Sequence, residues 1–236
     1  RTSLLKFDLR TGLAQPLTFG YHDVSLLDIN NDGSKVLFMT TRTRLTHRPT
    51  TLFSIFSLDV RTLKADTLLC DDGFIASAAF SPNGKEIVVM GSPEAFNGIG
   101  ANVPNGRVPS MYDYQLFTLR LSDRQVTPLT KTFDPGISQY AWNHADGKLY
   151  FSAMNRDSVS LYCCDTKSKK IVKIHQPEEV VKRISFAHSA PIMAWAGESA
   201  SNADRVYTMN LSAKRPKVVE DTNLQTLAGI RLGECK

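Results

Sequence analysis

One short stretch of the sequence has the residue types of a nucleophilic serine site. AWAGESAS places Gly197, Glu198 and Ser199 directly after an apolar run, close to the G-x-S-x-G turn that exposes a catalytic serine at the end of a strand. The fifth position is Ser201 instead of Gly, and the following NADRVYTMNL is typical of a turn and a strand, whereas the motif needs a helix. Enzymes with this motif carry their catalytic His after the Ser, and the last His here is His188. The chain therefore cannot complete a Ser/Asp/His triad, and we predict no catalytic residue in it.

The cysteines and the remaining histidines do not have the spacing of a metal site, since there is no C-x-x-C pair and no neighbouring histidine cluster. Adjacent cysteines on a strand point to opposite faces, which argues against a disulfide between Cys163 and Cys164. We expect buried free thiols at Cys70, Cys163, Cys164 and Cys235. We interpret the scattered histidines as polar turn residues: His22, His47, His144 and His175. No metal and no cofactor is predicted.

A hairpin motif that recurs along the sequence predicts the strands that would position any site. AFSPNGKEIVVMGS places Asn83-Gly84 between apolar runs, and LLDINNDGSKVLFM and YAWNHADGKLYFSA repeat the arrangement around Asp32-Gly33 and Asp146-Gly147. Such pairs tolerate the positive φ of tight hairpin turns. A degenerate copy, ISFAHSAPIMAWA, has Ala190-Pro191 in its place. The copies predict one supersecondary unit that is used repeatedly.

A second pattern follows each hairpin. Five gap-free segments alternate apolar and polar residues, turn through a polar stretch and end in a short apolar segment; they start at Leu4, Ile55, Leu116, Leu161 and Val206. The period of two is that of a half-buried strand. Each repeat thus has four strands, and the apolar runs KVLFM, EIVVM and PIMAWA indicate strands buried on both faces.

The repeat length is roughly 45 residues, which is typical of β-propeller blades. We predict an all-β fold, a partial β-propeller of about four and a half four-stranded antiparallel blades. The expected division is residues 1–19 for the second half of a truncated blade, 20–70, 71–131, 132–176 and 177–220 for four blades, and 221–236 for an exit segment. Because the chain opens with the third strand of a repeat, we expect an excerpt from a longer protein, whose targeting segment would be elsewhere.

One connection is longer than the others. The segment 91–114, GSPEAFNGIGANVPNGRVPSMYDY, exceeds the same connection in the next repeats by about 15 residues and is rich in Gly and Pro. Long loops on rigid scaffolds often carry recognition, although packing against another domain is an equal alternative. The candidate substrate contacts are Glu94, Asn97, Arg107 and Tyr112.

Composition excludes some classes of partner. The chain of 236 residues is 42% hydrophobic, and its net charge of +5 is spread along the sequence. It has no basic block and no interleaving of aromatic with basic residues, so we predict no nucleic-acid partner. No apolar stretch reaches about 18 residues, so no membrane span is predicted.

Taken together, FSPNGKEIVV, WNHADGKLYFSA, LYCCDTKSKKIVKI and the closing LAGIRLGECK make the whole chain resemble the non-catalytic propeller of the prolyl oligopeptidase and dipeptidyl peptidase family of serine peptidases. The hairpin motifs are shared with other propellers, including Tol-B-like ones. The resemblance implies a separate α/β-hydrolase domain, a periplasmic or extracellular location and peptide substrates.

In the dipeptidyl branch of that family, a tandem Glu on a propeller loop grips the free amino terminus of the substrate. Glu178-Glu179 is a tandem Glu, but it lies between repeats beside Pro177 and lacks the aromatic context of the family. We interpret it as a solvated linker.

Two functions of different class stay open. The chain is either the gating and orienting propeller of a dipeptidyl aminopeptidase of the serine type, or a scaffold for protein contacts. Blade faces left without a neighbour at the two ends would be apolar, so we also expect a homodimer through these faces.

Overall fold

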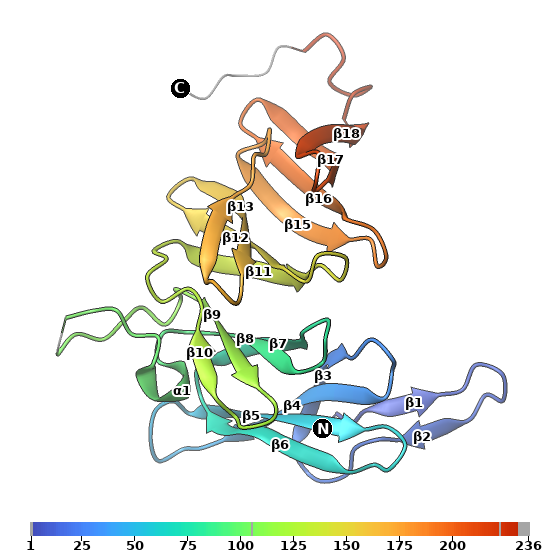
Figure 1. The fold of residues 1–236 in the computed structure, drawn as a ribbon, viewed down its shortest axis with the longest axis vertical. Helices are drawn as coiled ribbons and strands as arrows, with labels where there is room; N and C mark the ends of the chain where they lie inside the picture. Colours follow the sequence, from blue (N-terminus) through green and yellow to red (C-terminus); the bar gives the residue numbers. More distant parts are fainter. Residues whose placement is uncertain (1, 105, 222, 231–236) are drawn as a thin grey trace. The chain divides into compact units, whose positions relative to one another are not determined.

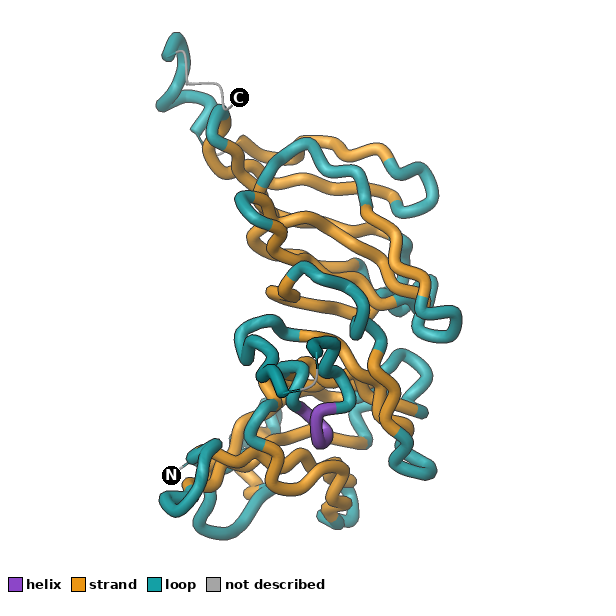
Figure 2. The backbone as a smooth tube through the Cα atoms, turned by 90° about the vertical axis from the view of Figure 1, so that its left-hand side faces the viewer, coloured by secondary structure: helices purple, strands orange, loops and turns teal. Residues whose placement is uncertain are grey.

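The computed structural model describes residues 2–104, 106–221 and 223–230. The chain forms two compact units, Arg1–Thr132 and Phe133–Lys236, and each is described by itself. Strands make up nearly all of the regular structure of both units (Figures 1 and 2). The all-β prediction is therefore confirmed.

The first unit holds a two-stranded sheet and two four-stranded antiparallel sheets, in which each strand pairs with the next along the chain. The two-stranded sheet consists of β1 (Leu5–Phe7) and β2 (Ala14–Pro16). The first four-stranded sheet consists of β3 (Asp23–Ile29), β4 (Lys35–Thr43), β5 (Thr51–Asp59) and β6 (Ala65–Asp72). The second consists of β7 (Ile75–Phe80), β8 (Glu86–Gly91), β9 (Gln115–Arg120) and β10 (Val126–Pro128), with the short helix α1 (Ala95–Gly98) between β8 and β9.

The second unit repeats the same four-stranded order twice. Its first sheet consists of β11 (Gly136–Trp142), β12 (Leu149–Asn155), β13 (Ser158–Asp165) and β14 (Lys170–Lys173). Its second consists of β15 (Val180–Phe186), β16 (Ile192–Ser199), β17 (Asn202–Asn210) and β18 (Arg215–Asp221). A single parallel pair, Val159 with Val180, links the two sheets where the chain passes from one to the next. We call each four-stranded sheet a blade.

The predicted hairpin turns join the first and second strands of their blades. Gly33, Gly84 and Gly147 all have φ between 65° and 69°, a conformation that side chains strain to adopt. The second strands that follow are buried on both faces: Ile87, Val88 and Val89 are all fully inaccessible to solvent. A strand of this kind needs an apolar neighbour on each side.

Neighbouring blades supply that cover within each unit. In the first unit, Leu37 and Ile55 of one blade share a core cluster with Ile87 and Phe117 of the next. In the second unit, Leu161 of one blade shares a cluster with Trp195 of the next. The ring of Trp195 stacks on Tyr207 with centroids 5.4 Å apart. The cores thus lie between blades rather than within one sheet.

We predict that Leu161→Ala lowers the free energy of unfolding of the second unit by about 2–5 kcal/mol, because it leaves a cavity in the cluster between its blades. Met154→Ala, on the neighbouring strand but with its side chain more than half exposed, serves as the control and should change stability by about 0.5 kcal/mol or less. Both tryptophans of the chain, Trp142 and Trp195, lie in this unit, so urea unfolding followed by tryptophan fluorescence measures it selectively. Equal stabilities of the two variants would contradict a core between the blades.

Candidate functional site

The long connection between β8 and β9 begins as a tightly held segment. The Asp72 carboxylate accepts hydrogen bonds from the backbone N–H groups of Phe74, at 2.8 Å, and Phe96, at 2.7 Å. It therefore ties the crossover between the two blades to the connection. The Phe96 ring packs on Phe117 with centroids 5.3 Å apart. Phe96 and Asn97 both have positive φ, 54° and 60°, which interrupts α1 and turns the chain back sharply.

This segment is one wall of a hollow of about 460 Å³ within the first unit. The other walls come from the loop between β4 and β5 and from the crossover between β6 and β7. The lining residues are Arg44, Pro49, Leu52, Leu69, Cys70, Asp71, Asp72, Gly73, Phe74, Glu94, Phe96, Asn97, Ile99 and Val126. The volume lies within the range of about 300–1,000 Å³ that is typical of ligand sites.

Some of the polar groups in the hollow are already engaged. Asp72 holds the two backbone amides, and the Asp71 carboxylate pairs with Arg42 at 2.6 Å. Both side chains of the latter pair are exposed, so it contributes little to stability. Both oxygens of Asp72 are thus used to shape the loops and are not available to a ligand.

Three polar groups remain available. The Nε–H of Arg44 is buried and has no hydrogen-bond partner in the described part of the chain, although its Nη2 donates to the Pro49 carbonyl at 3.3 Å. The Glu94 carboxylate and the Asn97 side-chain amide likewise make no hydrogen bond to a described residue. A buried donor without a partner is costly, which favours a ligand acceptor at this point. The hollow thus combines one free carboxylate and two groups that can donate with the apolar side chains of Phe74 and Phe96.

The structure separates the four predicted contacts into two pairs. Glu94 and Asn97 line the hollow, whereas Arg107 and Tyr112 lie in the exposed remainder of the connection and do not. Sequence analysis missed Arg44, which precedes Glu94 by about 50 residues in the chain. The sequence does contain a signal for it. The connection RTRLTHRPTT, at the same place in the preceding repeat, is also basic and contains Pro.

Ser199 lies at the end of β16 and faces Asn202 across the hairpin to β17. Its hydroxyl accepts a hydrogen bond from the Asn202 side chain at 3.3 Å. A strand follows it, as the sequence indicated, so the strand-to-helix geometry of a nucleophile elbow is not formed here.

The interpretation of Glu178-Glu179 as a solvated linker is wrong for Glu178, which is only 4% exposed. Its carboxylate accepts a hydrogen bond from the Tyr207 hydroxyl and lies 3.6 Å from Arg205 Nη1. Burial, together with this hydrogen bond, raises the pKa of Tyr207 to about 12. Glu179 is exposed and accepts from the Ala200 N–H at 3.2 Å. The Glu178 side chain lies against Gly197 of β16, where an added Cβ would come within 3.2 Å of the Glu178 Cβ, so the glycine permits this close approach.

One other expectation needs correction. The expected burial of all cysteines fails at Cys70, which is exposed because β6 is the outermost strand of its blade; Cys163 is half-buried, and Cys164 is fully buried. Burial raises the pKa of the Cys164 thiol to about 12. Cys235 lies outside the described residues.

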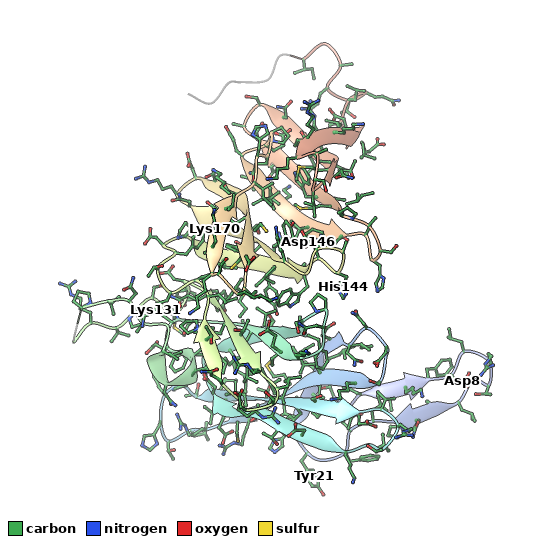
Figure 3. The ribbon with its side chains drawn as sticks, viewed as in Figure 1. Asp8, Tyr21, Lys131, His144, Asp146 and Lys170 are labelled. Carbon is green, nitrogen blue, oxygen red and sulfur yellow. The ribbon has the colours of Figure 1, made fainter. Side chains whose placement is uncertain are left out.

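The histidines are not all isolated. His144 and His188, at corresponding turns of the two blades of the second unit, stack with ring centroids 5.3 Å apart. Figure 3 labels His144 and Asp146 on the first of these turns. Among the residues that the structure describes, no group of three or more His, Cys, Asp or Glu side chains could hold a metal ion, and no helix is long and apolar enough to cross a membrane.

Comparison with solved structures identifies the fold. The chain superposes on TolB from Acinetobacter baumannii with a TM-score of 0.64 and 16% sequence identity, covering 93% of this chain and 49% of TolB. An oligogalacturonate lyase in complex with manganese superposes with a TM-score of 0.69 and 12% sequence identity, covering 93% of this chain and 59% of the lyase. Dipeptidyl peptidase 4 from Porphyromonas gingivalis superposes with a TM-score of 0.59 and 16% sequence identity, covering 93% of this chain and 37% of the peptidase. The fold is part of a β-propeller.

At these identities the likeness shows the fold alone, which peptidases share with TolB and with a lyase. The chain spans less than two thirds of the length of each of these structures. A scan against protein-family models finds no match, and neither does a search of curated proteins. Any functional assignment therefore depends on the side chains of the candidate site.

We predict that Asp72→Asn speeds hydrogen exchange of the Phe74 or Phe96 amide by about tenfold, because an amide has one acceptor oxygen for two N–H donors. Exchange mass spectrometry on peptides that contain these residues measures the effect. Asp71→Asn is the control, since Asp71 contacts the Arg42 side chain instead. If both variants protect these amides as the unaltered chain does, Asp72 does not organise the hollow.

Proposed function

We propose that this chain is a non-catalytic part of the propeller of a dipeptidyl- or prolyl-oligopeptidase-type serine exopeptidase, and that it gates and orients peptide substrates. The observation that carries the proposal is the hollow in the first unit, in which the Glu94 carboxylate, the Asn97 amide and the Arg44 Nε–H are free to bind. The sequence resemblance and the propeller fold support the same assignment.

The chemistry of the hollow suits the end of a short peptide. The Glu94 carboxylate would pair with the ammonium group of a free amino terminus, a charge-assisted contact that is stronger than a neutral hydrogen bond. Arg44 and Asn97 would donate to peptide carbonyl groups. The rings of Phe74 and Phe96 would contact an apolar side chain.

Proteolysis itself would belong to an α/β-hydrolase domain that is not in this chain, as the resemblance implies. A periplasmic or extracellular location is part of the same proposal. The expected association of two copies through open blade faces stays a prediction.

The alternative is a Tol-B-like propeller that only scaffolds protein contacts. The likeness to TolB supports it as much as the likeness to the peptidase supports the first function, because the sequence identity and the coverage of this chain are the same for both. The two functions differ in whether the hollow takes a peptide terminus, which an experiment can decide.

We predict that the chain binds a short fluorescent peptide with a free amino terminus and that Glu94→Gln weakens this binding about tenfold, since the ammonium loses its charged partner. The N-acetylated peptide should bind more weakly to the unaltered chain and equally to both forms. Fluorescence anisotropy measures the affinities. Asp113→Asn, an exposed carboxylate of the same connection outside the hollow, is the matched control.

A loss for both peptides in Glu94→Gln would indicate damage to the loop rather than a lost ion pair. If neither peptide binds to the unaltered chain, the peptide function is wrong and the scaffold function takes its place.

We also predict that the isolated chain does not hydrolyse chromogenic dipeptidyl substrates. The Ser199 hydroxyl hydrogen-bonds Asn202, and in the described part of the chain no histidine hydrogen-bonds it. Turnover that persists through repurification and disappears in Ser199→Ala would refute this prediction.

A further inference from the structure

A second hollow, of about 550 Å³, lies within the second unit, between its two blades. One blade contributes Asp146, Lys148, Tyr150, Cys163 and the segment 172–175, and the other contributes Pro191, Met209, Leu211, Ser212 and Lys214. No step of the proposed peptide function uses these residues. Its volume is within the range of small-molecule sites.

The inner wall of this hollow is the apolar core of the unit. Tyr150 and Met209 are buried members of the cluster between the blades, and Cys163, Ile174 and Leu211 pack against it. The cover is incomplete because β14, the outermost strand of its blade, is only four residues long. An apolar wall of this kind gains free energy when an apolar group replaces water.

The rim of the hollow is cationic. Lys148, Lys173 and Lys214 are exposed, and none of them forms a salt bridge with a carboxylate in the described residues. The one carboxylate of the lining, Asp146, accepts a hydrogen bond from the Tyr150 hydroxyl at 2.6 Å. Positive charge therefore dominates at the mouth of an apolar hollow.

We infer that this hollow binds a small amphipathic anion, with its apolar body against Tyr150 and Met209 and its carboxylate or sulfonate group at the three rim lysines. The apolar body supplies most of the affinity by burial, and the lysines select for the negative charge. The bound ligand would also cover the Cys163 thiol, which provides a reporter inside the site.

The test compares two probes of nearly the same shape, 1-anilinonaphthalene-8-sulfonate and the uncharged N-phenyl-1-naphthylamine. We expect the sulfonate to bind about tenfold more tightly than the neutral probe. Added salt should weaken the binding of the sulfonate but not that of the neutral probe. Replacing Lys148, Lys173 and Lys214 together by Gln should remove this preference and leave the neutral probe unchanged. The matched control replaces Lys167, Lys169 and Lys170, exposed lysines of the same blade that do not line the hollow (Lys170 in Figure 3).

Thiol labelling assigns the binding to this hollow rather than to apolar surface elsewhere. In a Cys70→Ser, Cys235→Ser background, Cys164 is fully buried, so 4,4′-dithiodipyridine reports on Cys163. A saturating concentration of the sulfonate should slow labelling at least about tenfold, corresponding to at least 90% occupancy of the site. Leu211→Trp, which fills the hollow, should abolish binding of both probes, with circular dichroism to verify folding.

Four results would overturn the inference. The first is equal affinity for the two probes; the second is an equal loss of sulfonate binding in the control lysine variant. The third is a Cys163 labelling rate that the bound probe does not change, which would place the probe elsewhere. A Cys163 that is unreactive in the free chain, together with no probe binding, would mean that polypeptide covers the hollow, and it would also reject the small-molecule site.

Discussion

The structure depends on one constraint, which is that the second strand of a blade is apolar on both faces. Ile87, Val88 and Val89 are consecutive and fully buried, as are Leu149 and Phe151 in the corresponding strand of the second unit. A single sheet in water would leave both of these faces exposed, at a cost of about 25 cal/mol for each Å² of apolar surface. Stacking blade against blade removes this cost, and the clusters that join neighbouring blades in each unit are the result.

This constraint also determines where a ligand can bind. Since the faces of the blades are used for packing, polar groups can gather only where strands end or where two blades fail to fill the space between them. The hollow of the first unit is of the former kind, because two connections and a crossover build it. The hollow of the second unit is of the latter kind, because a short outer strand leaves the core partly uncovered. In both cases the rigid sheets hold the lining residues in place.

Sequence alone was sufficient for the features that depend on local chemistry. Turn glycines such as Gly84 and the period of two in the strands predict the hairpins and the all-β fold, since both arise from neighbouring residues. The same reasoning found the connection that carries Glu94 and Asn97. It could not place Arg44 in the same hollow, because that arrangement depends on how one blade lies on the next. The stacking of His144 on His188 escaped it for the same reason, whereas the exposure of Cys70 depends on the outermost place of β6 in its blade.

The buried Glu178 decides which carboxylate of the chain is available to an ammonium group. A buried carboxylate is stable only with partners, and Glu178 has the Tyr207 hydroxyl and, at 3.6 Å, Arg205. Withdrawing it to bind a ligand would leave Arg205 with Asp221 alone and the Tyr207 hydroxyl without its acceptor, which is costly for a buried hydroxyl. Glu94 has no such partners to lose among the described residues, and it already borders a hollow with free donors. Glu178 is therefore a structural element of the second unit, which leaves Glu94 as the carboxylate for an ammonium group in the peptide function that we propose.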